Sequence, residues 1–293
     1  NVQFIVSSHS PFLALGLQEE PDLKYIMIDL ERRVPCLPEQ TEIFRDVYNI
    51  MIAQNERFAD KYHELQAKLT DSTKPIVITE GKTDWKHLKA ALRRLSVEID
   101  IDFFEFDDNL GDTVLNDLLM SYARIPQLRP IIGIFDRDNT QLMTNIGIND
   151  CPYKVLGQNV YAFAIPLVHE DTYGSFISIE HYYNREDLTK MDENGRRMFL
   201  GDEFYPSGNS KDGQYQTKIS RIQNKISVNG IIDEKVYMSS DLEQAHSIAL
   251  SKNAFAELIY SDDSFADGFD FSAFAKIFGI IGAIISENNC DKK

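Results

Sequence analysis

The middle of the chain alternates short apolar runs with amphipathic segments. Apolar runs predict β-strands at residues 76–79, 101–106, 131–135 and 160–165. Between these runs, residues 86–95 and 113–122 carry the apolar spacing of helices. Strands that are apolar throughout and alternate with helices predict a parallel sheet that is covered on both faces. We therefore expect an α/β fold, with a Rossmann-like parallel sheet flanked by helices.

The two ends of the chain have a different character. Residues 2–7 and 24–30 are short β-rich runs, and residues 41–69 carry one apolar stripe that predicts a helix. From about residue 187 the chain is loop-rich and then helical, which predicts a helical C-terminal subdomain. Within it, the apolar run 277–285 is too short to cross a membrane and predicts a buried helix.

The composition is that of an ordinary globular protein, with 43% hydrophobic and 26% charged residues. The sequence has no apolar stretch long enough for a membrane span and no visible signal peptide. Its three cysteines are scattered and fit neither a disulfide framework nor a zinc site. We therefore expect a cytoplasmic protein with reduced thiols and no membrane partner.

The formal net charge of -16 argues against a broad nucleic-acid-binding surface, because phosphate binding needs basic groups. The charge is uneven, however, since residues 196–225 hold six Lys or Arg against three acids. This stretch predicts a surface that holds a phosphate backbone without reading sequence. Its candidate residues are Arg196, Arg197, Lys218, Arg221 and Lys225.

Three acidic motifs lie at or near the ends of predicted strands. They are ITEGKTD (78–84) with Glu80 and Asp84, IFDRDN (134–139) with Asp136 and Asp138, and ISIEHYY (177–183) with Ser178 and Glu180. The carboxyl ends of parallel strands form a common crevice, so these side chains are expected to converge. Converging carboxylates repel one another, and a hard cation such as Mg²⁺ or Mn²⁺ relieves that repulsion. The absence of His and Cys from these motif positions argues against zinc.

The letters GKT at 81–83 do not indicate a nucleotide-binding loop. A P-loop needs an earlier glycine, five residues before Gly81, and position 76 is an isoleucine inside a predicted strand.

These motifs resemble those of a known family. EGKTD followed by DRD resembles the Toprim domain shared by topoisomerases, primases and OLD (overcoming lysogenisation defect) nucleases, and the downstream SIE resembles the third motif of the OLD nucleases. The opening QFIVSSHSPFL resembles the end of an ABC-type ATPase domain, in which His9 would sense the γ-phosphate of ATP. The segment LSKNAFAELI (250–259) resembles the part of OLD nucleases that supplies a catalytic lysine, here Lys252.

The resemblance implies a domain layout. Residues 1–40 would be the tail of an ATPase domain, 41–73 a helical connector, 74–185 a Toprim core and 186–293 its loop-rich and helical continuation. Because the chain opens on Asn1 and a strand-like run, we expect sequence upstream that carries the ATP site. ATP would then be a cofactor only through that domain, which would also make the full-length protein a homo-oligomer.

The resemblance also implies an activity, namely two-metal hydrolysis of DNA phosphodiesters, regulated by the ATPase domain and related to Gabija-like phage defence. Asp136, Asp138 and Glu180 would hold one ion, and Glu80 and Asp84 the second. Ser178 would orient a metal-bound water, Glu80 is an alternative general base, and Lys252 would offset charge on the phosphate.

Other activities of such a site stay open at this stage. The substrate could be RNA, or the site could be a non-catalytic scaffold with a partner protein in a defence complex. Strand transfer and nucleotide polymerisation are less favoured, because the sequence shows no nucleophilic tyrosine context and no primase motif.

Overall fold

The computed structural model describes residues 27–29, 34–36, 73–106, 109–139, 143–144, 152–217, 230–240 and 246–290. The chain divides into two compact units, Asn1–Asp71 and Ser72–Lys293. In the first unit the description covers an antiparallel strand pair, β1 (Met27–Asp29) and β2 (Val34–Cys36), and β1 falls within the run expected at 24–30. The expected strand at 2–7, His9 and the expected helix at 41–69 lie outside the described residues.

The second unit is built on a five-stranded sheet with the strand order β4-β3-β5-β7-β6. The strands are β3 (Ile76–Thr79), β4 (Asp102–Phe103), β5 (Ile131–Phe135), β6 (Lys154–Gly157) and β7 (Val160–Ala164). The first four in the sheet order run parallel, and β6 pairs antiparallel with β7 at one edge. The expectation of an α/β fold with a mostly parallel sheet flanked by helices is confirmed.

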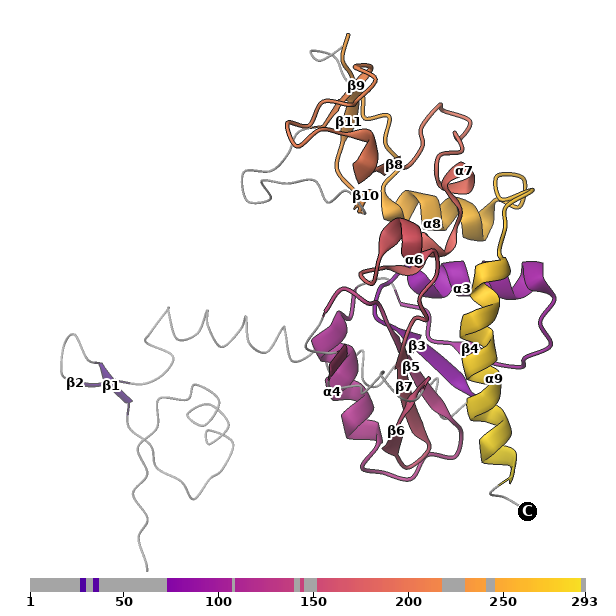
Figure 1. Cartoon of the computed structure of the whole chain (residues 1–293). Helices are drawn as coiled ribbons and strands as arrows, with labels where there is room; N and C mark the ends of the chain where they lie inside the picture. Colours follow the sequence, from indigo (N-terminus) through magenta and orange to yellow (C-terminus); the bar gives the residue numbers. More distant parts are fainter. Residues whose placement is uncertain are drawn as a thin grey trace, which may run out of the picture. The chain divides into compact units, whose positions relative to one another are not determined.

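The central strands are buried on both sides. Every residue of β3, β5 and β7 is buried, because helices cover both faces, with α4 (Asp112–Tyr122) and α9 (Ala275–Cys290) on opposite sides (Figure 1). Alternation along β5 separates the two faces: Ile132 and Ile134 belong to the same core cluster as Ile277 and Ile281 of α9.

Two further helices lie side by side at the carboxyl ends of the strands (Figure 1). They are α3 (Asp84–Leu95), which directly follows β3, and α8 (Lys252–Ser261). Both begin beside Glu180, and cross-contacts then run in order from Lys86–Glu257 to Arg94–Asp263. The two helices therefore run roughly parallel, with both N-termini at one place. Short helical turns, α6 (Glu170–Tyr173), η3 (Ile179–Tyr182) and α7 (Arg185–Leu188), join β7 to the C-terminal part.

The C-terminal part differs from the sequence-based expectation, because it contains short strands. An antiparallel pair joins β8 (Phe199–Leu200) to β10 (Ile231–Ile232), and a second joins β9 (Tyr215–Thr217) to β11 (Val236–Met238). Phe199, Phe204, Ile232 and Val236 form a small core of their own there. Strands of two or three residues are too short to show an alternating pattern, so the sequence could not indicate them. The buried helix expected at 277–285 is confirmed within α9, and no helix in the described part of the chain is long and apolar enough to cross a membrane.

Gly133, at the centre of β5, is expected to tolerate no side chain. A Cβ at this position would lie 2.2 Å from Cδ1 of Leu119, which is itself fully buried on α4. We expect Gly133→Ala to lower the free energy of unfolding by about 1–3 kcal/mol, because strand and helix must move apart. Chemical denaturation measures this, with Gly279→Ala as control: Gly279 lies on α9 with open space around it, so alanine there should be neutral or stabilising. Equal stability of the two variants would contradict the packing of α4 on β5.

Candidate carboxylate site

The site begins where β3 and β5 end side by side. The two strands pair in parallel with Thr79 opposite Ile134, so Glu80 and Asp136 follow their strands at the same edge of the sheet. The backbone N–H of Glu80 donates to the carbonyl of Ile134 over 3.2 Å, and the N–H of Asp136 donates to a carboxylate oxygen of Glu80 over 3.3 Å. The sheet register therefore brings the first two acidic motifs into contact.

Asp84 is brought back to this edge by the turn between β3 and α3. Its carboxylate accepts a 2.7 Å hydrogen bond from the N–H of Gly81, and the side chain is buried. A Cβ on residue 81 would lie 2.6 Å from Oδ1 of Asp84, so this close approach requires glycine. The turn thus places Asp84, the first residue of α3, next to the end of β3.

Glu180 enters from the third motif and is almost completely buried, with 2% of its surface exposed. Its Oε2 accepts hydrogen bonds from Oγ of Ser178 over 2.6 Å and from Nζ of Lys252 over 3.0 Å. Lys252 Nζ also donates to Ser178 Oγ over 3.0 Å. Lys252 is the first residue of α8, whose N-terminus is capped by Ser251, so the helix start fixes where this ammonium group lies.

The carboxyls of this site have perturbed acidities. Burial, together with the charge of Asp138, raises the pKa of Glu80 to about 7. Burial, together with the charge of Glu180, raises the pKa of Asp84 to about 7, and burial and Asp84 raise the pKa of Asp136 well above its usual range. These acids therefore lie close enough to oppose one another's ionisation.

Glu180 behaves in the opposite way. Burial alone would raise its pKa, but the Lys252 charge and the Ser178 hydrogen bond hold it at about 2. Burial would lower the pKa of Lys252, and Glu180 instead raises it above the usual range. Glu180 and Lys252 thus form a charged pair at the floor of the site.

The structure brings together the sequence-derived residues Glu80, Asp84, Asp136, Asp138, Ser178, Glu180 and Lys252. Asp138 lies exposed at the rim, where its charge acts on Glu80 and Asp84. Lys252 also acts on Asp84 and Asp136, so one ammonium group faces three acids of the cluster, Asp84, Asp136 and Glu180.

Two residues near the site were missed by sequence reasoning. Asp112, the first residue of α4, hydrogen-bonds the side chain of Asn139 in the DRDN motif and adds its charge to the field at Glu80. It lies nine residues beyond the end of β4, so no acid directly after a strand marked it in the sequence. His87 lies one turn after Asp84, fully buried, with Nδ1 3.0 Å from the Tyr183 hydroxyl. Burial lowers its pKa to about 4, so it is neutral at pH 7, and a lone helical histidine gave no signal.

The chemistry of this donor set suits a hard divalent cation. Its oxygen donors are carboxylates, of which Glu80, Asp84 and Asp136 have raised pKa values, and the Lys252 ammonium group acts on Asp84, Asp136 and Glu180. As the side chains are placed, however, no three His, Cys, Asp or Glu residues of the described part are close enough to hold an ion. The residues therefore fit such an ion by type and by charge, and side-chain rotation would have to complete a ligand shell.

The two arginines of the predicted basic stretch that the structure describes are both paired with acids. Arg197 donates to both carboxylate oxygens of Glu203, over 3.1 and 2.6 Å, and its guanidinium lies 3.8 Å from the ring centroid of Phe199. Arg196 pairs with the buried Asp192 over 2.8 Å. Both arginines thus stabilise the β8–β11 region, and Lys218, Arg221 and Lys225 lie outside the described residues.

No protein-family model, curated protein or solved structure matches this chain.

Proposed function

We propose that the unit Ser72–Lys293 is a metal-dependent nuclease that hydrolyses phosphodiester bonds of DNA at the carboxylate site. The observation that carries this proposal is the convergence of acids from three separate segments beside Lys252. Four of the acids are crowded enough to have perturbed pKa values, and Lys252 is the cation that faces them. Acids crowded in this way destabilise the fold unless a metal ion binds between them. A phosphoryl-transfer site uses such acids to hold its metal ions.

Each residue has a role in this proposal. Asp136, Asp138 and Glu180 would hold one Mg²⁺ or Mn²⁺, and Glu80 and Asp84 a second. Bound ions supply an activated water and stabilise the leaving oxygen. Glu80 is the alternative general base, in place of its role as a metal ligand, since its pKa without a metal ion is about 7. The Lys252 ammonium offsets charge that develops on the phosphate, and Ser178 positions both Lys252 and Glu180 through its hydroxyl.

The kind of nuclease domain is likewise proposed. We infer a Toprim domain of the OLD nuclease kind, because the acids follow β3 and β5 in the expected motifs and because Lys252 lies against the third motif. The full-length protein would then be a cytoplasmic, ATPase-regulated nuclease of the Gabija-like type, acting in phage defence. The upstream ATPase domain would be its oligomerisation surface.

A plasmid-nicking assay tests the proposed activity. Supercoiled DNA should be nicked or linearised with Mg²⁺ or Mn²⁺ and left intact with EDTA. A single-stranded RNA of matched length, assayed in parallel, tells whether DNA is the preferred substrate. The matched control is Asp117→Asn, since Asp117 is an exposed acid on α4 that has no contact with the site. Intact DNA and RNA with both metals, for a well-folded protein, would refute the nuclease proposal.

A further inference from the structure

A row of basic residues begins in the turn before helix α3, beside the carboxylate site, and continues along the helix. The row consists of Lys82, Lys86, Lys89 and Arg93, at spacings of four, three and four residues. Positions three or four apart on a helix are neighbours on one face, so Lys86, Lys89 and Arg93 form a continuous stripe. The helix starts at Asp84 inside the site and carries the stripe about 14 Å away from it, at 1.5 Å per residue.

Two aromatic rings support this stripe from below. The Nζ atoms of Lys86 and Lys89 lie 5.5 and 5.6 Å from the ring centroid of Trp85. Tyr260 of α8 meets Trp85 edge to face at 5.3 Å and lies under Lys89 and Arg93, at 5.6 and 5.3 Å. Because Trp85 is buried and its ring is covered by cations, the surface offers phosphate contacts rather than a stacking platform for bases.

The cations of the stripe are available for exchange. Lys86 pairs with Glu257 and Lys89 with Glu105, over 2.6 Å for the second pair, and the two glutamates are about half exposed. The lysine side chains are 18% and 30% exposed, but both pairs reach solvent through their glutamates, so a phosphate can replace the carboxylate there. Arg93 donates to the backbone carbonyl of Tyr260 over 2.8 Å. Lys82 and the three residues of the stripe thus carry four positive charges against two exchangeable acids. This makes the stripe a positive surface on a chain of net charge -16.

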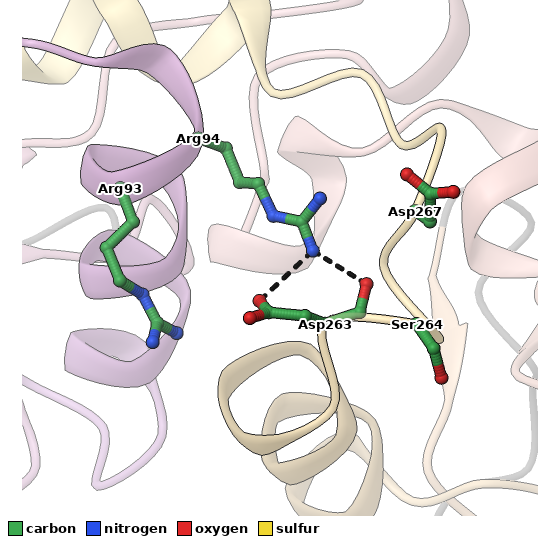
Figure 2. Close-up of a pocket in the computed structure, with 5 residues that line it drawn as sticks. All are labelled: Arg93, Arg94, Asp263, Ser264 and Asp267. Carbon is green, nitrogen blue, oxygen red and sulfur yellow. Dashed lines mark hydrogen bonds and ion pairs between the residues drawn. The ribbon is translucent and has the colours of Figure 1, made fainter.

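The stripe ends at the far end of α3. A hollow of about 540 Å³ opens there between the last turn of α3 and the loop after α8 (Figure 2). Arg94 donates to the carbonyl and carboxylate of Asp263, over 2.7 and 3.1 Å, and Asp267 lines the same hollow. Asp263 and Asp267 would repel a phosphate, so the stripe ends at Arg93.

We propose that this α3 stripe holds the phosphate backbone of a nucleic-acid strand and leads it into the carboxylate site. This inference rests on the proposed nuclease function and names the binding surface that the function needs. Backbone contacts by lysine and arginine position a strand without reading its sequence. The sequence suggested the same role for residues 196–225, of which Arg196 and Arg197 are paired with acids and Lys218, Arg221 and Lys225 lie outside the described residues.

The test is a binding titration of fluorescent single-stranded and duplex oligonucleotides, followed by anisotropy across a range of salt, with Ca²⁺ in place of Mg²⁺ to suppress cutting. Lys86→Gln/Lys89→Gln should weaken binding by roughly tenfold per lost contact and flatten the log–log salt slope, by about 0.9 per contact for duplex and about 0.7 for single strands. The control Lys154→Gln/Lys276→Gln removes the same charge elsewhere on the unit and should bind as the wild type does. Lys86→Arg/Lys89→Arg should retain the affinity, which separates lost charge from lost packing.

Trp85 adds a local readout, because it is the only tryptophan in the chain. Its emission should change along the same titration curve as the anisotropy, since Lys86 and Lys89 lie over its ring. Unchanged affinity and slope in the Lys86→Gln/Lys89→Gln variant of a protein that still nicks DNA would overturn the stripe and leave the proposed function standing. A wild-type protein that neither binds nor nicks would overturn both.

Discussion

Replacing Asp136 by Asn should lower metal-dependent cleavage by at least about 100-fold and leave the protein folded. Losing a group that merely orients a metal ligand costs 10–100-fold, so losing a proposed ligand should cost more. Asp136 follows β5 beside Glu80, and its carboxylate faces the charges of Asp84 and Glu180. The neutral amide removes that repulsion, so the melting temperature in EDTA should rise rather than fall. Initial nicking rates with Mg²⁺ and thermal melts with EDTA measure the two effects.

Asp117→Asn is the control for this experiment, because it makes the same chemical change on an exposed position of α4. It should cleave and melt as the wild type does. Wild-type cleavage by a well-folded Asp136→Asn protein would show that the carboxylate site is not where the chemistry occurs. A lower melting temperature in EDTA would instead show that the Asp136 carboxylate stabilises the metal-free fold.

The sheet could be predicted because its strands are buried on both faces. The strands β3 and β5 coincide with their predicted ranges, 76–79 and 131–135, since a strand covered on both sides has apolar residues at every position. The strand expected at 101–106 is only Asp102–Phe103. The edge strand β6 was missed, because Lys154 and Val155 are exposed and its residues show no apolar run.

The acids of the candidate site could be predicted for a related reason. Parallel strands end at one edge of the sheet, so acids that directly follow two neighbouring strands must meet. Lys252 is different, because its contacts with Ser178 and Glu180 span 74 and 72 residues and follow from no local pattern. It was named only through a family resemblance. The stripe was not identified from the sequence. The chain has 30 Lys and Arg, and these four basic residues are distinguished only by their position beside the site.

The second large effect concerns pH. We expect the metal-free protein to lose stability as the pH rises from about 5 to about 8. Glu80 and Asp84 have pKa values of about 7 in the folded state, against about 4 for such groups in an unfolded chain. Between these values the folded state binds more protons than the unfolded state, so the free energy of unfolding falls as the pH rises. Above about pH 8 the loss is complete.

Two other buried groups contribute with the opposite sign. Glu180 has a folded pKa of about 2, so its stabilising contribution is complete above about pH 5 and is lost only in acid. The folded pKa of His87 is about 4, below its usual value, so its contribution grows with pH until about 6.5. One histidine opposes three acids with raised pKa values, and above pH 6.5 the acids act alone.

The size of the effect follows from the buried Asp84. A carboxyl pKa that moves from about 4 to about 7 corresponds to roughly 4 kcal/mol of lost stability over its whole titration, of which roughly 3 kcal/mol falls between pH 5 and pH 8. Because the acids repel one another, their contributions do not add, and we expect a total of about 3 kcal/mol in this range. For a unit of this length, 3 kcal/mol corresponds to a decrease of about 6–12 °C in melting temperature. Mg²⁺ should reverse the loss most strongly at high pH, where the carboxylates are ionised and protons no longer compete for them.

Thermal melts at pH 5.5, 6.5, 7.5 and 8.5, each with EDTA or with Mg²⁺, measure both parts of this prediction. Glu80→Gln/Asp84→Asn isolates the site, because its amides cannot ionise. Its advantage over the wild type in EDTA should grow from pH 5.5 to 8.5, and its response to Mg²⁺ should disappear. Asp117→Asn should keep the wild-type profile in both buffers. A wild-type melting temperature in EDTA that is flat or rising above pH 6.5 would contradict the raised pKa values and remove the electrostatic argument for a cation at this site.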